Sequence, residues 1–160
     1  MVLYAFGLAQ ISTITFGYPD FKNFYIYPAA DKPKSEDWKI HDLLETIANN
    51  SKGGEVVIVL PDHYYLNGQS LELYRITGGY NFRVYNGVYL PFDVVFKNID
   101  KINFVVVIEP RKHTGGYYEI EKKLYELFYL KKDKFRLVKS FYLPDNSELL
   151  LYANKFVIQP

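Results

Sequence analysis

Residues 55–60 read EVVIVL and residues 102–110 read INFVVVIEP. Both runs lack the polar alternation of a half-exposed strand, which is typical of strands covered on both faces in a parallel sheet flanked by helices. Right-handed crossovers would place the two strands side by side if the strand order is 2-1-3. The sequence therefore predicts an α/β fold with a layered, Rossmann-like, mostly parallel sheet flanked by helices.

Helical patterns surround these two runs. Apolar residues recur at i, i+3, i+4 and i+7 over residues 40–47, which gives one apolar helix face, and Ser35 is the expected N-cap of this helix. Asn67 is the expected N-cap of a second helix that ends at the glycines of residues 78–79. Residues 117–132 predict a third helix with one apolar side.

The remaining segments complete the predicted domain. Residues 82–89 predict a second strand, whereas residues 91–101 fit a short helix through their leading proline or a strand through their valines. Residues 135–154 contain two apolar runs around the turn-type sequence PDNS, which predicts a C-terminal antiparallel hairpin. We expect an N-terminal arm or juxtamembrane segment over residues 1–34 and a single α/β domain over residues 35–160.

Composition limits the classes of function. The chain has 160 residues, 49% of them apolar, which is enough for one core and too few for two ordinary domains. A net charge of +1 gives no long-range field for nucleic acid, so nucleic acid is not an expected partner. The absence of cysteine excludes disulfides and thiol nucleophiles. No dinucleotide fingerprint, phosphate loop, nucleophile elbow or HExxH motif occurs, so we assign no cofactor, no metal site and no catalytic residue.

The N-terminal stretch, residues 2–17, is predominantly apolar. It is shorter than the roughly 20 residues of a spanning helix and has no basic flank, so it resembles neither a membrane span nor a signal peptide. Two interpretations remain open: a buried strand or short helix followed by an extended arm, or a segment that directly follows a membrane helix.

Polar residues follow both buried strands, where ligands bind in open parallel sheets. The first loop offers Asp62, His63 and Asn67, and the second offers Glu109, Arg111 and His113. We predict that these six residues line one cleft. Each also has a structural interpretation, because Asp62 suits a turn, His63 a hydrogen-bonded loop and Asn67 a helix cap. Arg111 and His113 also fit a solvated cluster at a strand end.

Three segments resemble a known family. SEDWKIHDLLETIANN (residues 35–50), VVIVLPDHYYLNGQSLELY (56–74) and FYLPDNSELLLYAN (141–154) are similar to the soluble C-terminal region of protein-mannosyltransferase-like enzymes, which are multi-spanning glycosyltransferases that use lipid-linked sugars. The shared features are a tryptophan-containing helix, a strand that ends in a VLPDH-like segment with a downstream asparagine, and a closing hairpin of the LPDGS type. Here Asn146 stands where that hairpin has glycine.

The resemblance implies a function. The parent protein would be a membrane-bound glycosyltransferase, and this piece would be a non-catalytic accessory domain on the extracytoplasmic face. Its partners would be the membrane portion of the same polypeptide and a lipid-linked sugar or glycan acceptor. The catalytic carboxylates of the family lie in membrane loops that have no counterpart here, so the resemblance transfers no catalytic residue.

Two alternatives come from other classes. The first is a free-standing Rossmann-like enzyme that uses His63 or His113 as a general base beside Asp62 or Glu109, because a carboxylate can orient an imidazole. The second is a structural or interaction module in which the aromatic residues of the N-terminal arm, Tyr18, Phe21, Phe24 and Tyr25, pack on a partner.

Overall fold

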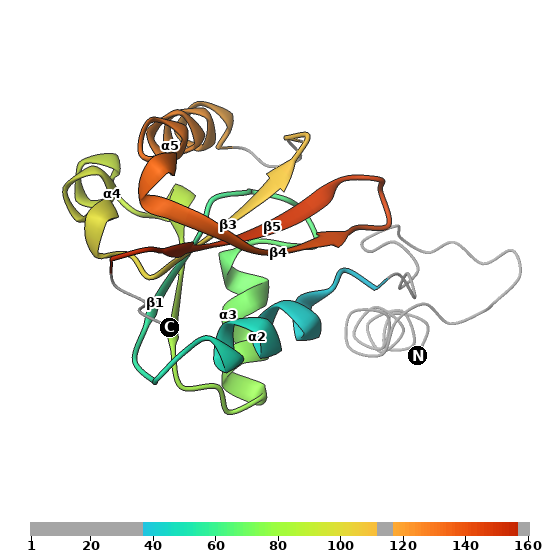
Figure 1. Cartoon of the computed structure of the whole chain (residues 1–160). Helices are drawn as coiled ribbons and strands as arrows, with labels where there is room; N and C mark the ends of the chain where they lie inside the picture. Colours follow the sequence, from blue (N-terminus) through green and yellow to red (C-terminus); the bar gives the residue numbers. More distant parts are fainter. Residues whose placement is uncertain (1–36, 112–116, 157–160) are drawn as a thin grey trace, which may run out of the picture. The chain divides into compact units, whose positions relative to one another are not determined.

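The computed structural model describes residues 37–111 and 117–156 (Figure 1). A five-stranded sheet has the order β2-β1-β3-β5-β4. The strands are β1 (Val56–Val59), β2 (Arg83–Asn86), β3 (Phe104–Glu109), β4 (Phe135–Tyr142) and β5 (Glu148–Asn154). The first three run parallel, whereas β5 is antiparallel to both β3 and β4. The fold is therefore a mixed α/β fold.

The predicted adjacency of the two apolar runs is confirmed. β1 pairs in parallel with β3 from Val57 opposite Phe104 to Val59 opposite Val106. Every residue of β3 except Glu109 is buried, as expected for a strand with helices on both of its faces. The register places the carboxyl ends of β1 and β3 at the same edge of the sheet.

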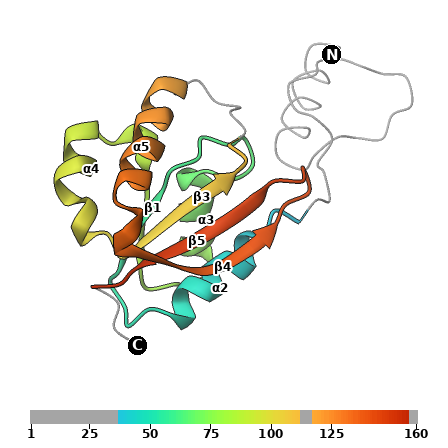
Figure 2. The ribbon, with the colours of Figure 1, turned by 45° about the horizontal axis from the view of Figure 1, so that its top comes forward.

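Among the described residues, four α-helices cover the two faces of the sheet (Figures 1 and 2). The helices α2 (Ile40–Asn49) and α3 (Gly68–Thr77) lie on one face, and α4 (Phe92–Asn98) and α5 (Tyr118–Leu130) lie on the other. Three short 3₁₀ helices complete the described elements: η1 (Gly87–Tyr89), η2 (Ile99–Lys101) and η3 (Lys132–Lys134). The segment that fitted either a helix or a strand forms α4, since Pro91 stands directly before its first turn.

The start of α2 differs from the prediction. The helix begins at Ile40, and its N-cap position is Lys39, with a left-handed φ of 58°. The carboxylate of Asp37 accepts the Lys39 N–H at 2.9 Å, so this side chain orders the turn before the helix. The prediction that Ser35 caps this helix is therefore wrong, and Ser35 itself lies outside the described residues.

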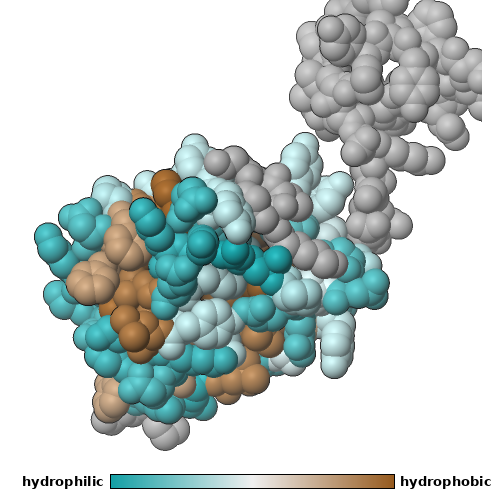
Figure 3. Space-filling view, turned by 90° about the horizontal axis from the view of Figure 1, so that it is seen from above, coloured by the Kyte–Doolittle hydropathy of each residue, from teal (hydrophilic) through white to brown (hydrophobic). Residues whose placement is uncertain are grey.

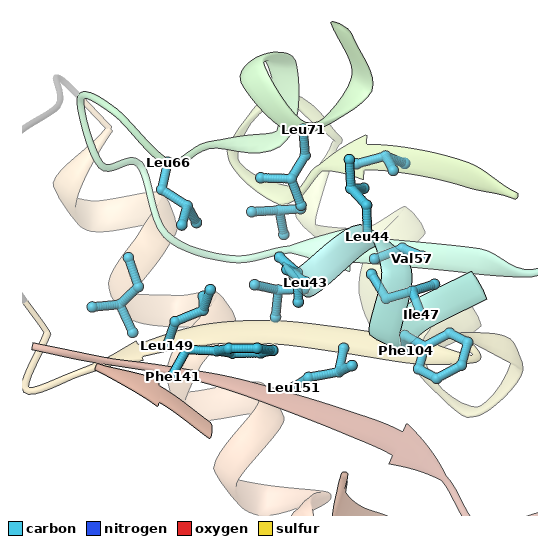
Figure 4. Packing of buried hydrophobic residues seen from close by; sticks show 14 of the residues in the cluster. Leu43, Leu44, Ile47, Val57, Leu66, Leu71, Phe104, Phe141, Leu149 and Leu151 are labelled. Atoms are coloured by element: carbon cyan, nitrogen blue, oxygen red, sulfur yellow. The ribbon is translucent and has the colours of Figure 1, made fainter. Parts of the chain in front are cut away.

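Apolar side chains fill both layers. Figure 4 shows α2 side chains packed against those of the strands. The layer beneath α2 and α3 is built from buried leucine, isoleucine, valine and phenylalanine residues, among them Leu43, Leu44, Ile47, Val57, Leu66, Leu71, Phe104, Phe141, Leu149 and Leu151. The layer beneath α4 and α5 is built from Ile58, Val88, Val95, Val105, Leu124, Phe128 and Tyr152, among others.

Beyond Val106 the two central strands diverge. The Leu60 N–H still donates to the Val106 carbonyl at 3.0 Å, but the paired register of β1 and β3 ends there. Two residues further along β3, the hydroxyl of Tyr125 accepts the Ile108 N–H at 3.0 Å and donates to the Ile108 carbonyl at 3.3 Å. Tyr125, from α5, thus supplies hydrogen bonds that a continuing β1 would have supplied, because buried backbone groups need partners.

Replacing this hydroxyl should destabilise the fold. Tyr125→Phe leaves both Ile108 backbone groups without this partner, and we expect the free energy of unfolding to fall by about 1–3 kcal/mol. Tyr142→Phe, at an exposed position of β4, is the control and should change it by less than about 0.5 kcal/mol. Urea denaturation measures both variants, and equal effects would contradict the role given to Tyr125.

The same hydroxyl predicts a dependence on alkaline pH. Burial raises the pKa of Tyr125 above its ordinary value, and the hydrogen bond with Ile108 only partly opposes this shift. A group with a raised folded-state pKa stabilises fully below its unfolded pKa of about 10, and this stabilisation is lost as the pH rises. The difference in unfolding free energy between the parent and Tyr125→Phe should therefore shrink above about pH 10, by up to about 1.4 kcal/mol per pH unit. Denaturation curves across that range would reject this expectation if the difference stays constant.

Candidate functional site

His63 is the centre of a cluster at the carboxyl end of β1. Its side chain is buried, and its ring centroid lies 4.8 Å from that of Trp38, just ahead of α2. Its Nε2 lies 4.0 Å from Oδ2 of Asp145, in the turn between β4 and β5. Three segments that are far apart in the sequence therefore meet at one imidazole.

Hydrogen bonds orient the His63 loop. The Tyr65 N–H donates to Nδ1 of His63 at 3.4 Å, and the Asn67 amide donates to the His63 carbonyl at 3.1 Å. Because Nδ1 accepts a hydrogen bond, the neutral ring carries its proton on Nε2, which faces Asp145. Trp38 also stacks on Tyr65 with ring centroids 4.9 Å apart. The imidazole is thus fixed by aromatic rings as well as by polar contacts.

The carboxylate of Asp145 is held by its own turn. Its Oδ1 accepts the backbone N–H of Ser147 at 3.0 Å and the Ser147 hydroxyl at 2.5 Å. Serine, aspartate and histidine thus lie together, but the serine donates to the carboxylate and not to the imidazole. A nucleophilic serine needs the imidazole as its base, so this arrangement is not a catalytic triad.

Asn67 has the structural role of a helix cap. Its side-chain oxygen accepts the N–H groups of Gln69 and Ser70, both at 3.0 Å, and Ser70 Oγ in return accepts the Asn67 N–H at 3.1 Å. This reciprocal capping box confirms the predicted cap of α3. The next residue must be glycine, because a Cβ at Gly68 would lie 2.4 Å from Cα of Asn86 at the end of β2.

Glu109 and Arg111 lie on the opposite face of the sheet. Glu109 stands two residues after Val107 and four after Val105, so it shares with them the face of the sheet beneath α5. Its carboxylate accepts a hydrogen bond from the hydroxyl of Tyr129. Arg111 donates to the Tyr118 hydroxyl at 3.4 Å, and its guanidinium carbon lies 5.1 Å from the centre of that ring. These two residues therefore belong to the α5 layer, whereas His63 belongs to the α2 layer.

Burial raises the pKa of Tyr129, and its hydrogen bond to Glu109 adds to this shift. Both causes favour the protonated phenol, so Tyr129 remains a hydrogen-bond donor to Glu109 at neutral pH. His113 lies outside the described residues, and its predicted place beside Glu109 and Arg111 stays a prediction. The single predicted cleft therefore divides, over its described residues, into two groups on opposite faces.

α5 fills the junction between the two strand ends. Glu121 is fully buried, and its carboxylate accepts the Asp62 N–H at 3.2 Å. One helical turn further along, Tyr125 bonds to the backbone of Ile108. These two side chains occupy the place where β1 and β3 diverge, which is where an open parallel sheet would hold a ligand.

Sequence reasoning did not select Trp38, Glu121 or Asp145. A signal was present for Glu121, because it stands three, four and seven residues before Leu124, Tyr125 and Phe128, all buried on one side of α5. Asp145 was noted only as part of the turn sequence PDNS, since its contact with His63 bridges the β1 loop and a turn more than 80 residues later in the chain.

Comparisons of the chain with protein-family models, with curated protein sequences and with solved structures found no match. Within residues 37–111 and 117–156, no helix has both the length and the apolar character to cross a membrane. Over the same residues, no group of three or more histidine, aspartate or glutamate side chains is placed to hold a metal ion.

The turn that carries Asp145 can be tested through its backbone. Asn146 has a φ of 64°, which costs a residue with a Cβ roughly 1–2 kcal/mol, although asparagine tolerates this region better than alanine. We expect Asn146→Ala to lower the free energy of unfolding by about 1 kcal/mol and Asn146→Gly to leave it near the parent value. Thermal or urea denaturation distinguishes the two, and an alanine variant as stable as the glycine variant would argue against the left-handed turn.

Proposed function

We propose that this chain is a non-catalytic accessory domain of a membrane-bound glycosyltransferase, located on the extracytoplasmic face of the membrane. Its partner is the membrane portion of the same polypeptide, and its ligand class is a lipid-linked sugar or a glycan acceptor. The chemistry of glycosyl transfer is assigned to that membrane portion. The domain serves to hold or present what the membrane portion acts on.

The observation that carries this proposal is the convergence at His63. The three segments that resemble the protein-mannosyltransferase-like family contribute Trp38, His63 and Asp145, respectively. Trp38 and Asp145 both lie against the His63 ring, at 4.8 Å between ring centroids and at 4.0 Å from Nε2. The three motifs that carry the resemblance therefore lie in one cluster, and the proposal rests on this convergence.

A second observation supports the non-catalytic part of the proposal. A Rossmann-like enzyme would bind its substrate where β1 and β3 diverge. In this chain Glu121 and Tyr125, both buried, fill that junction with hydrogen bonds to Asp62 and Ile108. A substrate would have to displace these bonds, and buried polar groups are costly to leave unpaired.

We also propose a Rossmann-like layering with a C-terminal antiparallel hairpin as the detailed description of the fold. The parallel pairing of β1 with both β2 and β3 supports the layering, as does the placement of helices on both faces. The antiparallel pairing of β4 with β5 across residues 143–147 supports the hairpin.

The gene tests the membrane part of this proposal. The reading frame upstream of Val2 should encode repeated apolar segments of about 20 residues, long enough to span a bilayer. Sequencing of the transcript, or mass spectrometry of the native protein, measures this directly. A native product that begins at Met1 would overturn the proposal.

Ligand binding can be followed through Trp38, the single tryptophan of the chain. We expect its fluorescence to change saturably when lipid-phosphate sugars or oligosaccharides are added to the 160-residue chain. Asp145→Asn should weaken this binding about tenfold, which is the loss of roughly one charged hydrogen bond. Asp133→Asn, an exposed position in η3, is the control and should bind like the parent. Absence of any saturable change would remove the ligand and leave a scaffold role.

A further inference from the structure

Exposed aromatic residues surround the carboxyl end of the parallel strands. Tyr64 follows β1, Tyr89 lies in η1 after β2, Phe92 begins α4, Tyr117 and Tyr118 lie at the start of α5 after β3, and Tyr142 ends β4. Tyr142 pairs with Glu148, which pairs with Glu109 at the end of β3, so all of these residues share one end of the sheet. We call this set the aromatic rim.

The aromatic rim is exposed and partly continuous. Tyr64 is 77% exposed and Tyr142 is 81% exposed. Tyr89 packs edge-on against Tyr117 at 5.0 Å, and Phe92 lies 6.3 Å from Phe96 on the outer side of α4. Figure 3 shows a separate group of apolar side chains at the left of the view, the side on which α4 lies in Figure 2.

The opposite end of the sheet carries lysines beside the exposed apolar side chains of Leu130 and Phe156. Lysines stand in the segments that precede the parallel strands and in those that flank the hairpin strands there: Lys52, Lys101, Lys131, Lys132, Lys134 and Lys155. Phe104 at the start of β3 pairs with Ala153 near the end of β5, which places these segments at one end. We call this set the lysine end. Exposed tyrosines therefore gather at one end of the strands and lysines at the other.

The chain joins the described fold at the aromatic rim. Asp37 is the first described residue, and the ring of the next residue, Trp38, contacts that of His63 directly beyond β1. The preceding 36 residues include the apolar sequence of residues 2–17. The point at which the described fold begins therefore lies at the end of the sheet that carries the rim.

We propose that the aromatic rim is a membrane-contact surface that rests on the lipid headgroups, with the lysine end turned toward water. Tyrosine suits this position because its ring is apolar and its hydroxyl is polar, and tyrosine is enriched at the interface between a bilayer and water. This inference rests on the proposed function for the presence of a membrane. It adds the orientation of the domain and the chemistry of its contact.

The rival orientation makes a distinct prediction. Lysines attract anionic lipids, so contact through the lysine end would require an anionic bilayer and would weaken strongly as salt is added. Contact through aromatic burial requires no anionic lipid and changes little with salt. Neutral phosphatidylcholine vesicles therefore distinguish the two orientations.

The experiment uses single cysteines, because the native chain has none. Tyr64→Cys and Tyr142→Cys place a label at the rim, while Leu130→Cys and Phe156→Cys place it at comparably exposed positions, 73% and 74%, toward the lysine end. Each variant of the 160-residue chain carries an environment-sensitive fluorophore and is mixed with phosphatidylcholine vesicles. We expect the rim labels to shift toward the blue and the other two to keep their emission in water.

A serine series measures the contribution of the side chains themselves. Tyr64→Ser combined with Tyr142→Ser should weaken partition into neutral vesicles by about tenfold or more, since two exposed rings no longer leave water. Leu130→Ser combined with Phe156→Ser removes similar apolar area elsewhere and should leave partition unchanged. Vesicle sedimentation measures both double variants.

Three outcomes would overturn the proposal: no partition into neutral vesicles, blue shifts confined to positions 130 and 156, or equal loss in both serine variants. Rim labels that respond to a protein partner but not to lipid would assign the surface to that partner instead. These outcomes leave the upstream reading frame untouched, so failure of the membrane contact is distinguishable from failure of the proposed function.

Discussion

The divergence of β1 from β3 beyond Val106 is the constraint on which the rest of the structure depends. Up to that residue the strands share a parallel ladder, and past it the Ile108 backbone needs a partner from elsewhere. Tyr125 provides this partner, and the bond fixes the position of α5 along the sheet. In that position the carboxylate of Glu121 accepts the N–H of Asp62. The opening that this topology creates is therefore closed by the domain's own helix.

Beyond this point the loop that follows β1 turns toward the face of the sheet covered by α2 and α3. His63 in this loop contacts Trp38, which lies just before α2, and Asp145, which lies in the turn after β4. Local bonds hold each participant: Asn67 binds the His63 carbonyl while it caps α3, and Ser147 binds the Asp145 carboxylate. Such a network holds the His63 ring in one orientation, because the Tyr65 N–H, Asn67 and Ser147 all make structural hydrogen bonds around it.

The fold was largely predictable because its signals are local. Unbroken apolar runs indicated β1 and β3, a 3.6-residue period indicated α2, and an asparagine before a glycine indicated the cap of α3. The site was not predictable to the same extent. Whether Glu109 turns toward His63 or toward Tyr129 depends on the face to which each strand residue points, and that follows from the register of the whole sheet. The contact of His63 with Asp145 likewise exists only once β5 has paired with β3.

The direction of β5 has one more consequence. Because β5 runs antiparallel to β3, its last residue, Asn154, lies beside Ile102 and Asp100, at the amino ends of the parallel strands. The described chain thus begins beside Trp38, at the carboxyl ends of the parallel strands, and finishes just after Asn154, at their amino ends. Segments attached before Asp37 and after Phe156 would therefore leave the domain at opposite ends of the sheet.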